Sequence, residues 1–266
     1  MTVQIPQNVS QETLKRFILA LADDELVLGH RDSEWTGYGP ILEEDIAFSN
    51  IAQDELGHSL VWFSLYHELG GDDPDTMGFT REWSDFTCCR FVAYPKGDFA
   101  YTVVRQFLFD VAEEERLKML MESAFPPVRE IAERLSREEA YHILHSQGLV
   151  ERLGDATEES HQRMQQAVDA AFPQALGMFE KIEREGELVA AKVFAGNDIL
   201  KSEWLKRVVP VLEGATLTVP VHSANGSYVI ACAADEGGRK GSHTEHLRQL
   251  VGDMQVVYRS IPGAKW

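Results

Sequence analysis

The sequence predicts an all-α protein, and three observations support this fold class. Most of the chain carries apolar residues at steps of three and four, which is the period of an amphipathic helix. Glycine and proline gather in a few short stretches between these segments, such as "GGDDPD" and "AFPPVRE". Hydrophobic residues make up 44% of the 266 residues, enough for a substantial core. We therefore expect a helical bundle and not a disordered chain.

The first two helices are expected over residues 10–30 and about 43–68. Ser10 is a suitable N-cap for the first, and apolar residues follow it at helical spacing. The stretch "RDSEWTGYGPIL" between the two helices contains two glycines and a proline, so it is expected to be a loop. The stretch "GGDDPD" is expected to end the second helix.

Residues 71–98 show no clear periodicity, and we expect a long connection with short helical pieces there. A third helix is predicted over about 99–123. A fourth follows the Pro126–Pro127 break and runs to about Leu153. A fifth is predicted over about 158–185, with a kink at Pro173 and a stop at Gly186.

The C-terminal part is expected to hold another helix over about 198–212 and a last one over 242–261. Residues 214–241 are the least helical stretch and are predicted to contain extended segments. Ser242 and Glu245 fit a capping box. The buried stripe of the last helix is predicted to be Leu247, Leu250, Met254 and Val257.

Two long antiparallel helix pairs separated by a long linker are typical of a four-helix bundle. We expect one domain with its core bundle over about residues 10–155 and a C-terminal helical extension over about 156–266. The extension also contains "GGRKGSHTEHL", in which basic residues stand at a glycine-rich helix start. Such a start can hold an anion, but a capped helix with solvated basic residues is the favoured interpretation.

Net charge, cysteine content and the N-terminal segment indicate which partners and which location to expect. The net charge of -18 would repel phosphate backbones and anionic lipids, so nucleic acid and membranes are not expected partners. A protein with a basic face suits this chain better. The three cysteines have no metal-binding spacing and are expected to be reduced thiols. No signal peptide is recognisable in "MTVQIPQNVSQET", so we expect a cytoplasmic protein.

A repeated Glu-x-x-His pattern is the main indication of a functional site in this sequence. "DELGH" contains Glu55 and His58, and "REEAYH" contains Glu139 and His142. Residues three apart share a helix face, and in both helices the pair stands on the apolar, inward stripe. A buried carboxylate costs several kcal/mol unless it is paired or bound to a cation. The repeat therefore indicates two ligand-bearing helices.

The other two helices of such a bundle are expected to supply one acid each. The first helix offers Glu25, which lies on its apolar stripe 30 residues before Glu55. The third helix offers Asp110 or Glu114, both on the inward face. In a tight hairpin around the two prolines Asp110 would stand level with Glu139, so Asp110 is preferred and Glu114 is the second choice.

Glu25 stands 30 residues before Glu55, and Asp110 stands 29 residues before Glu139. This repeated spacing is strong evidence for a ferritin-like ancestry. The predicted metal ligands are Glu25, Glu55, His58, Asp110, Glu139 and His142. Carboxylates with two histidines suit iron or manganese. The alternative is a metal-free polar core, in which hydrogen bonds satisfy the buried groups of Glu25, His58, Asp110 and His142.

The chain resembles a known family, the structural C subunits of bacterial phenylacetyl-CoA epoxidases. The stretches that carry the resemblance are "LADDELVLGHRDSEW", "DIAFSNIAQDELGH", "REEAYHILHSQGLVERLGD" and the ending "GGRKGSHTEHL…DMQ…PGAKW". The resemblance implies a ferritin-like fold. It also implies a heterodimer with the related catalytic A subunit, which holds a di-iron centre, and an association with the B and reductase subunits.

In that family the C subunit is a non-catalytic, structural partner in the epoxidation of phenylacetyl-CoA. Familiar C subunits have lost several ligand positions, whereas this sequence keeps all six. We therefore consider two hypotheses. The first is a structural subunit of the epoxidase in aerobic phenylacetate catabolism. The alternative is an oxygen-activating di-iron or di-manganese enzyme in its own right, with Glu55 and Glu139 as bridging carboxylates.

Overall fold

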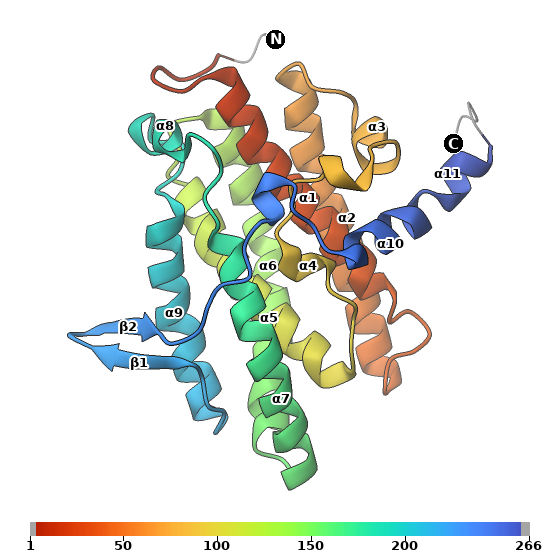
Figure 1. Ribbon diagram of the computed structural model, residues 1–266, viewed down its shortest axis with the longest axis vertical. Helices are drawn as coiled ribbons and strands as arrows, with labels where there is room; N and C mark the ends of the chain where they lie inside the picture. The colour runs from red at the N-terminus through yellow and green to blue at the C-terminus, as the bar shows by residue number, and fades with distance from the viewer. Residues whose placement is uncertain (1–3, 262–266) are drawn as a thin grey trace. The chain divides into compact units, whose positions relative to one another are not determined.

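The structure is a computed structural model that describes residues 4–261. Among these residues it contains eleven α-helices, three short 3₁₀-helices and one two-stranded sheet (Figure 1). The chain forms two compact units. The first comprises Gln11–Pro95 together with the C-terminal segment from Gly237, and the second comprises Lys96–Glu236 together with Ile5–Ser10. The predicted all-α class is confirmed.

The first unit is built on an antiparallel pair of long helices, α1 (Gln11–Ser33) and α2 (Leu42–Glu68), as expected. The side chain of Gln11, at the start of α1, donates to the carbonyl of Leu69, just past the end of α2 (2.6 Å). The linker that follows contains only short helical pieces, as predicted: α3 (Pro74–Phe79), η1 (Trp83–Asp85) and α4 (Arg90–Ala93).

The C-terminal segment of the first unit differs from the prediction. It forms η3 (Gly238–Lys240), α10 (Glu245–Met254) and α11 (Val256–Ser260). The predicted capping box is wrong: Thr244 occupies the N-cap of α10 without a side-chain cap bond, and the Ser242 hydroxyl instead accepts from Arg90 (2.8 Å).

The predicted buried stripe of the last helix ends early. Leu247 and Leu250 are buried, but Val257 is 59% exposed. The reason is a break at Gln255, whose side-chain amide is buried and donates to the carbonyl of Arg81 (2.7 Å). The helical phase changes there, so Val257 no longer faces the core.

The second unit is built on α5 (Phe99–Leu120) and α6 (Pro126–Gly154), which form a hairpin around the predicted proline break. Helices α7 (Glu158–Ala175) and α9 (Asn197–Gly214) both pack against α5 and α6. Each unit therefore contains one pair of long helices, which is consistent with the ferritin-like fold that the sequence predicts.

The predicted fifth helix is shorter than expected. It ends at Ala175 and continues as η2 (Leu176–Phe179), and Gly186 lies inside a separate helix, α8 (Glu185–Ala190). The carbonyl of Pro173 accepts from the backbone N–H of Asp235 (3.0 Å), a residue far along the chain. A β-carbon at Gly177 would lie 2.3 Å from the carbonyl oxygen of Asp235, so only glycine fits this close approach.

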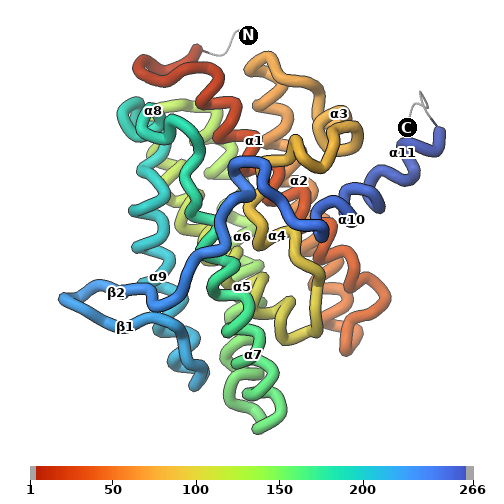
Figure 2. The backbone as a smooth tube through the Cα atoms, in the orientation of Figure 1, coloured from red at the N-terminus to blue at the C-terminus, as the bar shows by residue number. Residues whose placement is uncertain are grey.

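The predicted extended stretch contains a β-hairpin, traced in Figure 2. Strands β1 (Val221–Ala224) and β2 (Ser227–Ile230) are antiparallel, with Val221 opposite Ile230. Both turn residues, Asn225 and Gly226, have positive φ, as a tight two-residue hairpin turn requires.

Two further findings concern the described part of the chain. The three cysteines are free thiols, and two of them, Cys88 and Cys89, are buried. No helix among residues 4–261 combines the length and the apolar character needed to cross a bilayer.

Candidate metal centre

Three predicted ligands meet inside the first unit. Glu25 comes from the buried stripe of α1, where Leu21 and Leu28 flank it, and Glu55 and His58 come from the buried stripe of α2. All three side chains are almost fully buried. The helix period explains this placement, because the three residues occupy positions at which the bundle otherwise buries apolar residues.

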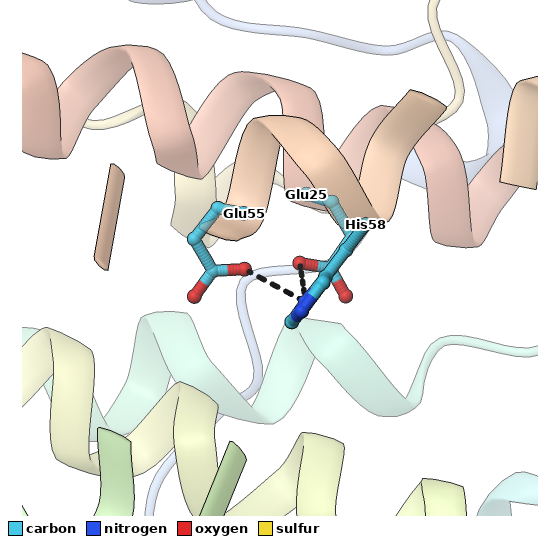
Figure 3. A group of neighbouring side chains, drawn as sticks. All are labelled: Glu25, Glu55 and His58. Atoms are coloured by element: carbon cyan, nitrogen blue, oxygen red, sulfur yellow. Dashed lines mark ion pairs between the residues drawn. The ribbon is translucent and has the colours of Figure 1, made fainter. Parts of the chain in front are cut away.

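The three side chains converge on one point (Figure 3). The Nδ1 atom of His58 lies 3.8 Å from a carboxylate oxygen of Glu25 and 3.9 Å from one of Glu55. One potential ligand atom from each residue lies within 4.8 Å of the other two. The described part of the chain thus contains a compact, buried group of one imidazole and two carboxylates.

The distances from His58 to the two glutamates are too long for hydrogen bonds and are compatible with a shared metal ion. A hydrogen bond between nitrogen and oxygen requires about 2.7–3.2 Å, which is shorter than both distances. Nitrogen and oxygen ligands lie roughly 2.1 Å from a first-row metal, so two ligand atoms of one ion are separated by at most about 4.2 Å. The distances of 3.8 and 3.9 Å fall below that limit. The donor set is also one that iron and manganese accept.

Gly29 allows α1 and α2 to approach each other. A β-carbon at this position would lie 3.0 Å from the β-carbon of Glu55 and 3.1 Å from the carbonyl oxygen of Ala52. Gly29 stands one helical turn after Glu25 on α1. This contact was not predicted from the sequence, although an isolated glycine within a helical pattern is a signal of close packing.

The second unit holds the other three predicted ligands. Asp110 on α5 and both Glu139 and His142 on α6 are completely buried. The Nδ1 atom of His142 lies 3.4 Å from a Glu139 oxygen. Asp110 accepts from the Ser146 hydroxyl (2.6 Å) and from the Gln106 amide (2.7 Å). Burial, and secondly the negative charge of Glu139, raise the pKa of Asp110 well above its usual value.

The two candidates on the third long helix have different environments. Glu114, the second choice, is partly exposed and forms ion pairs with Arg207 (2.6 Å) and Lys118 (3.0 Å). Burial alone would raise the pKa of Glu114, but hydrogen bonds from these two cations outweigh it and hold the pKa below its usual value. Asp110, and not Glu114, therefore shares the buried environment of Glu139 and His142.

Two buried ion pairs lie beside Glu25 and were not predicted from the sequence. Asp23 is paired with Arg81, and Asp24 is paired with Arg239. The interpretation of Arg239 as a solvated residue is wrong, because its side chain is only 4% exposed. The anion that this glycine-rich segment binds is a carboxylate of the same chain.

Fold and site define a class: an all-α protein with ferritin-like helix pairs that bear buried carboxylate and histidine groups able to hold a metal. The chain belongs to the phenylacetic acid catabolic protein family, whose model matches residues 2–266. It is 35% identical over 254 residues to the C subunit of the 1,2-phenylacetyl-CoA epoxidase of Escherichia coli (strain K12). That match covers 95% of this chain and 99% of the relative. The resemblance seen in the sequence is confirmed.

Proposed function

We propose that this chain is the C subunit of a phenylacetyl-CoA epoxidase and serves aerobic phenylacetate catabolism as the structural partner of the catalytic subunit. The observation that carries the proposal is the end-to-end likeness to the Escherichia coli protein, which leaves almost no part of either chain uncovered. This likeness favours the subunit role over the independent oxygenase. The acidic net charge of -18 suits a partner with a basic contact face.

Co-expression with the catalytic subunit of the same epoxidase tests the proposal. We expect the two chains to purify together through a tag on either one and to elute as one species in gel filtration. The B and reductase subunits are added in turn to ask which of them joins. A chain that elutes alone from every mixture would contradict the subunit role.

We further propose that this subunit retains a metal, held in the first unit by Glu25, Glu55 and His58. The matching set Asp110, Glu139 and His142 is proposed as the ligand set of the second unit. Iron or manganese suits both sets because their donors are carboxylates and imidazoles without thiolates. A bound divalent cation would compensate buried negative charge that otherwise costs several kcal/mol.

Metal analysis of protein purified without chelator and then loaded anaerobically with Fe²⁺ or with Mn²⁺ tests this part. We expect roughly one metal or more per chain in the wild type, and a clear loss in His58→Ala and His142→Ala. His67→Ala is the matched control, because His67 is exposed and hydrogen-bonds the carbonyl of Gly71 near the end of the same helix. Less than about 0.2 metal per wild-type chain after loading would support the metal-free polar core instead.

A further inference from the structure

Two consecutive aspartates precede Glu25 on α1, and an arginine holds each of them. The carboxylate of Asp24 accepts hydrogen bonds from both terminal nitrogens of Arg239, with 2.9 Å between Nη1 and Oδ1. This bidentate geometry fixes a carboxylate in position and orientation. Its Oδ1 atom also accepts from the backbone N–H of Cys89 (2.8 Å). The side chains of Asp24 and Arg239 are 1% and 4% exposed.

Arg239 hydrogen-bonds the backbone of α1 as well as the side chain of Asp24. Its Nη1 atom donates to the carbonyl of Ala20 (3.1 Å) and to that of Thr87 (3.0 Å). Ala20 lies one helical turn before Asp24. The guanidinium therefore spans the turn of α1 that leads into Glu25.

The segment that carries Arg239 is itself fixed. A β-carbon at Gly238 would lie 2.4 Å from the carbonyl oxygen of Cys88, so the backbone passes closer than any other residue would permit. Arg90 donates to the carbonyl of Ser242 (2.7 Å) on the far side of Arg239. Contacts on both sides of Arg239 therefore hold the backbone of this residue in place.

Asp23 fixes the same turn from another direction. It is paired with Arg81 and accepts from the backbone N–H of Thr87 (2.7 Å). Successive residues of a helix point about 100° apart, so two anchored neighbours prevent rotation and sliding of the turn. Glu25 is the next residue on the helix, so the anchored side chains of Asp23 and Asp24 also determine the direction of the Glu25 side chain.

We propose that Arg239 is a positioning residue for the metal ligand Glu25, so that the C-terminal segment of the chain sets the metal affinity of the first unit. This inference rests on the proposed metal site. Groups that orient ligands without touching the metal change affinity by about 10- to 100-fold when they are lost. The substitution Arg239→Lys would keep the charge but lose the planar fork that reaches a carboxylate and two carbonyls together.

The experiment is a Co²⁺ titration of the full-length chain, followed by visible absorption and by calorimetry. Co²⁺ is the probe because it accepts the same donors and reports its coordination by colour. The variants are Arg239→Met, Arg239→Lys and the charge-neutral double variant Asp24→Asn with Arg239→Met. Arg248→Met is the matched control, because it removes an exposed pair with Glu245 from the same C-terminal segment.

We expect Co²⁺ to bind about 10- to 100-fold more weakly to Arg239→Met and to the double variant, with an altered absorption band. Arg239→Lys should fall between these variants and the wild type, and Arg248→Met should match the wild type. Affinities are compared only among variants that circular dichroism shows to be folded at the titration temperature. If Arg239→Met does not fold, because it leaves Asp24 buried without its cation, the double variant decides.

Two results would overturn the inference, and they are distinguishable. Wild-type affinity and an unchanged absorption band in the folded double variant would reject the role of Arg239 while the metal site stands. Absence of Co²⁺ binding to the wild type would reject the metal site and this inference with it.

Discussion

Gly29 lies against Glu55: a β-carbon on the glycine would stand 3.0 Å from the β-carbon of the glutamate. This contact joins α1 to α2 at the level of the candidate metal centre. It relates the packing of the first unit directly to the geometry of its predicted ligands, because any shift of α2 at this point moves Glu55.

Substitution Gly29→Ala is expected to destabilise the protein by about 1–3 kcal/mol, the usual cost of overpacking a dense interior. It should also weaken metal binding, because Glu55 must move. Denaturant unfolding and metal titration check both effects. Gly57→Ala on α2 is the control, since its β-carbon would meet nothing within 4 Å. We expect that variant to be neutral or up to about 1 kcal/mol more stable.

Ser146→Ala removes the hydroxyl that donates to Asp110 in the second unit. We expect a loss of about 1–3 kcal/mol in the free energy of unfolding, because a buried carboxylate oxygen loses its donor. The control is Ser136→Ala on the same helix, whose hydroxyl donates to the Glu133 carbonyl at an exposed position. Equal stability of the two variants would show that the Ser146 bond contributes nothing.

Metal is expected to raise the thermal stability of the wild type. A ligand that binds only the folded state at 100 times its dissociation constant stabilises it by about 2.7 kcal/mol. Thermal melts with Mn²⁺, with and without excess chelator, measure the effect. We expect it to shrink in His58→Ala, which removes the central group of the first ligand set. A wild-type melt that does not respond to Mn²⁺ would contradict the retained metal site.

Stability is expected to fall on mild acidification, partly through His243. Burial lowers the pKa of His243 below 6.5, and its Nε2 atom lies 2.6 Å from the Phe86 carbonyl. The unfolded chain therefore binds the proton more readily than the folded protein does. The contribution is fully present above pH 6.5 and is lost as the pH falls below it. In His243→Gln the free energy of unfolding should depend less on pH between about 7 and 5.5, and an unchanged slope would argue against this residue.

The long helices and the burial of the polar residues on their apolar stripes could be predicted because local periodicity determines them. Glu25, Glu55 and His58 interrupt apolar stripes that are visible in the sequence, and the structure buries all three. The preference for Asp110 followed from counting residues around the proline break, and Asp110 is indeed buried while Glu114 is not.

The remaining features depend on partners far away in the sequence. Arg239 stands 215 residues from Asp24, and a basic residue among glycines normally indicates solvent exposure. The early end of α7 depends on Asp235, and the missing capping box depends on Arg90, which engages Ser242. Such tertiary contacts override local signals, and no single stretch of sequence contains both partners. The union of the two ligand sets in one dimetal centre stays a prediction of the sequence.

The most direct test of the subunit role is the rate of phenylacetyl-CoA epoxidation by the purified components, measured with and without this chain. We expect the complete mixture to be active and omission of the chain to reduce the rate at least about tenfold, a loss of roughly 1.4 kcal/mol or more in transition-state stabilisation. Adding the chain back should restore the rate. An equal rate in its absence would show that the chain is not a working subunit of the epoxidase.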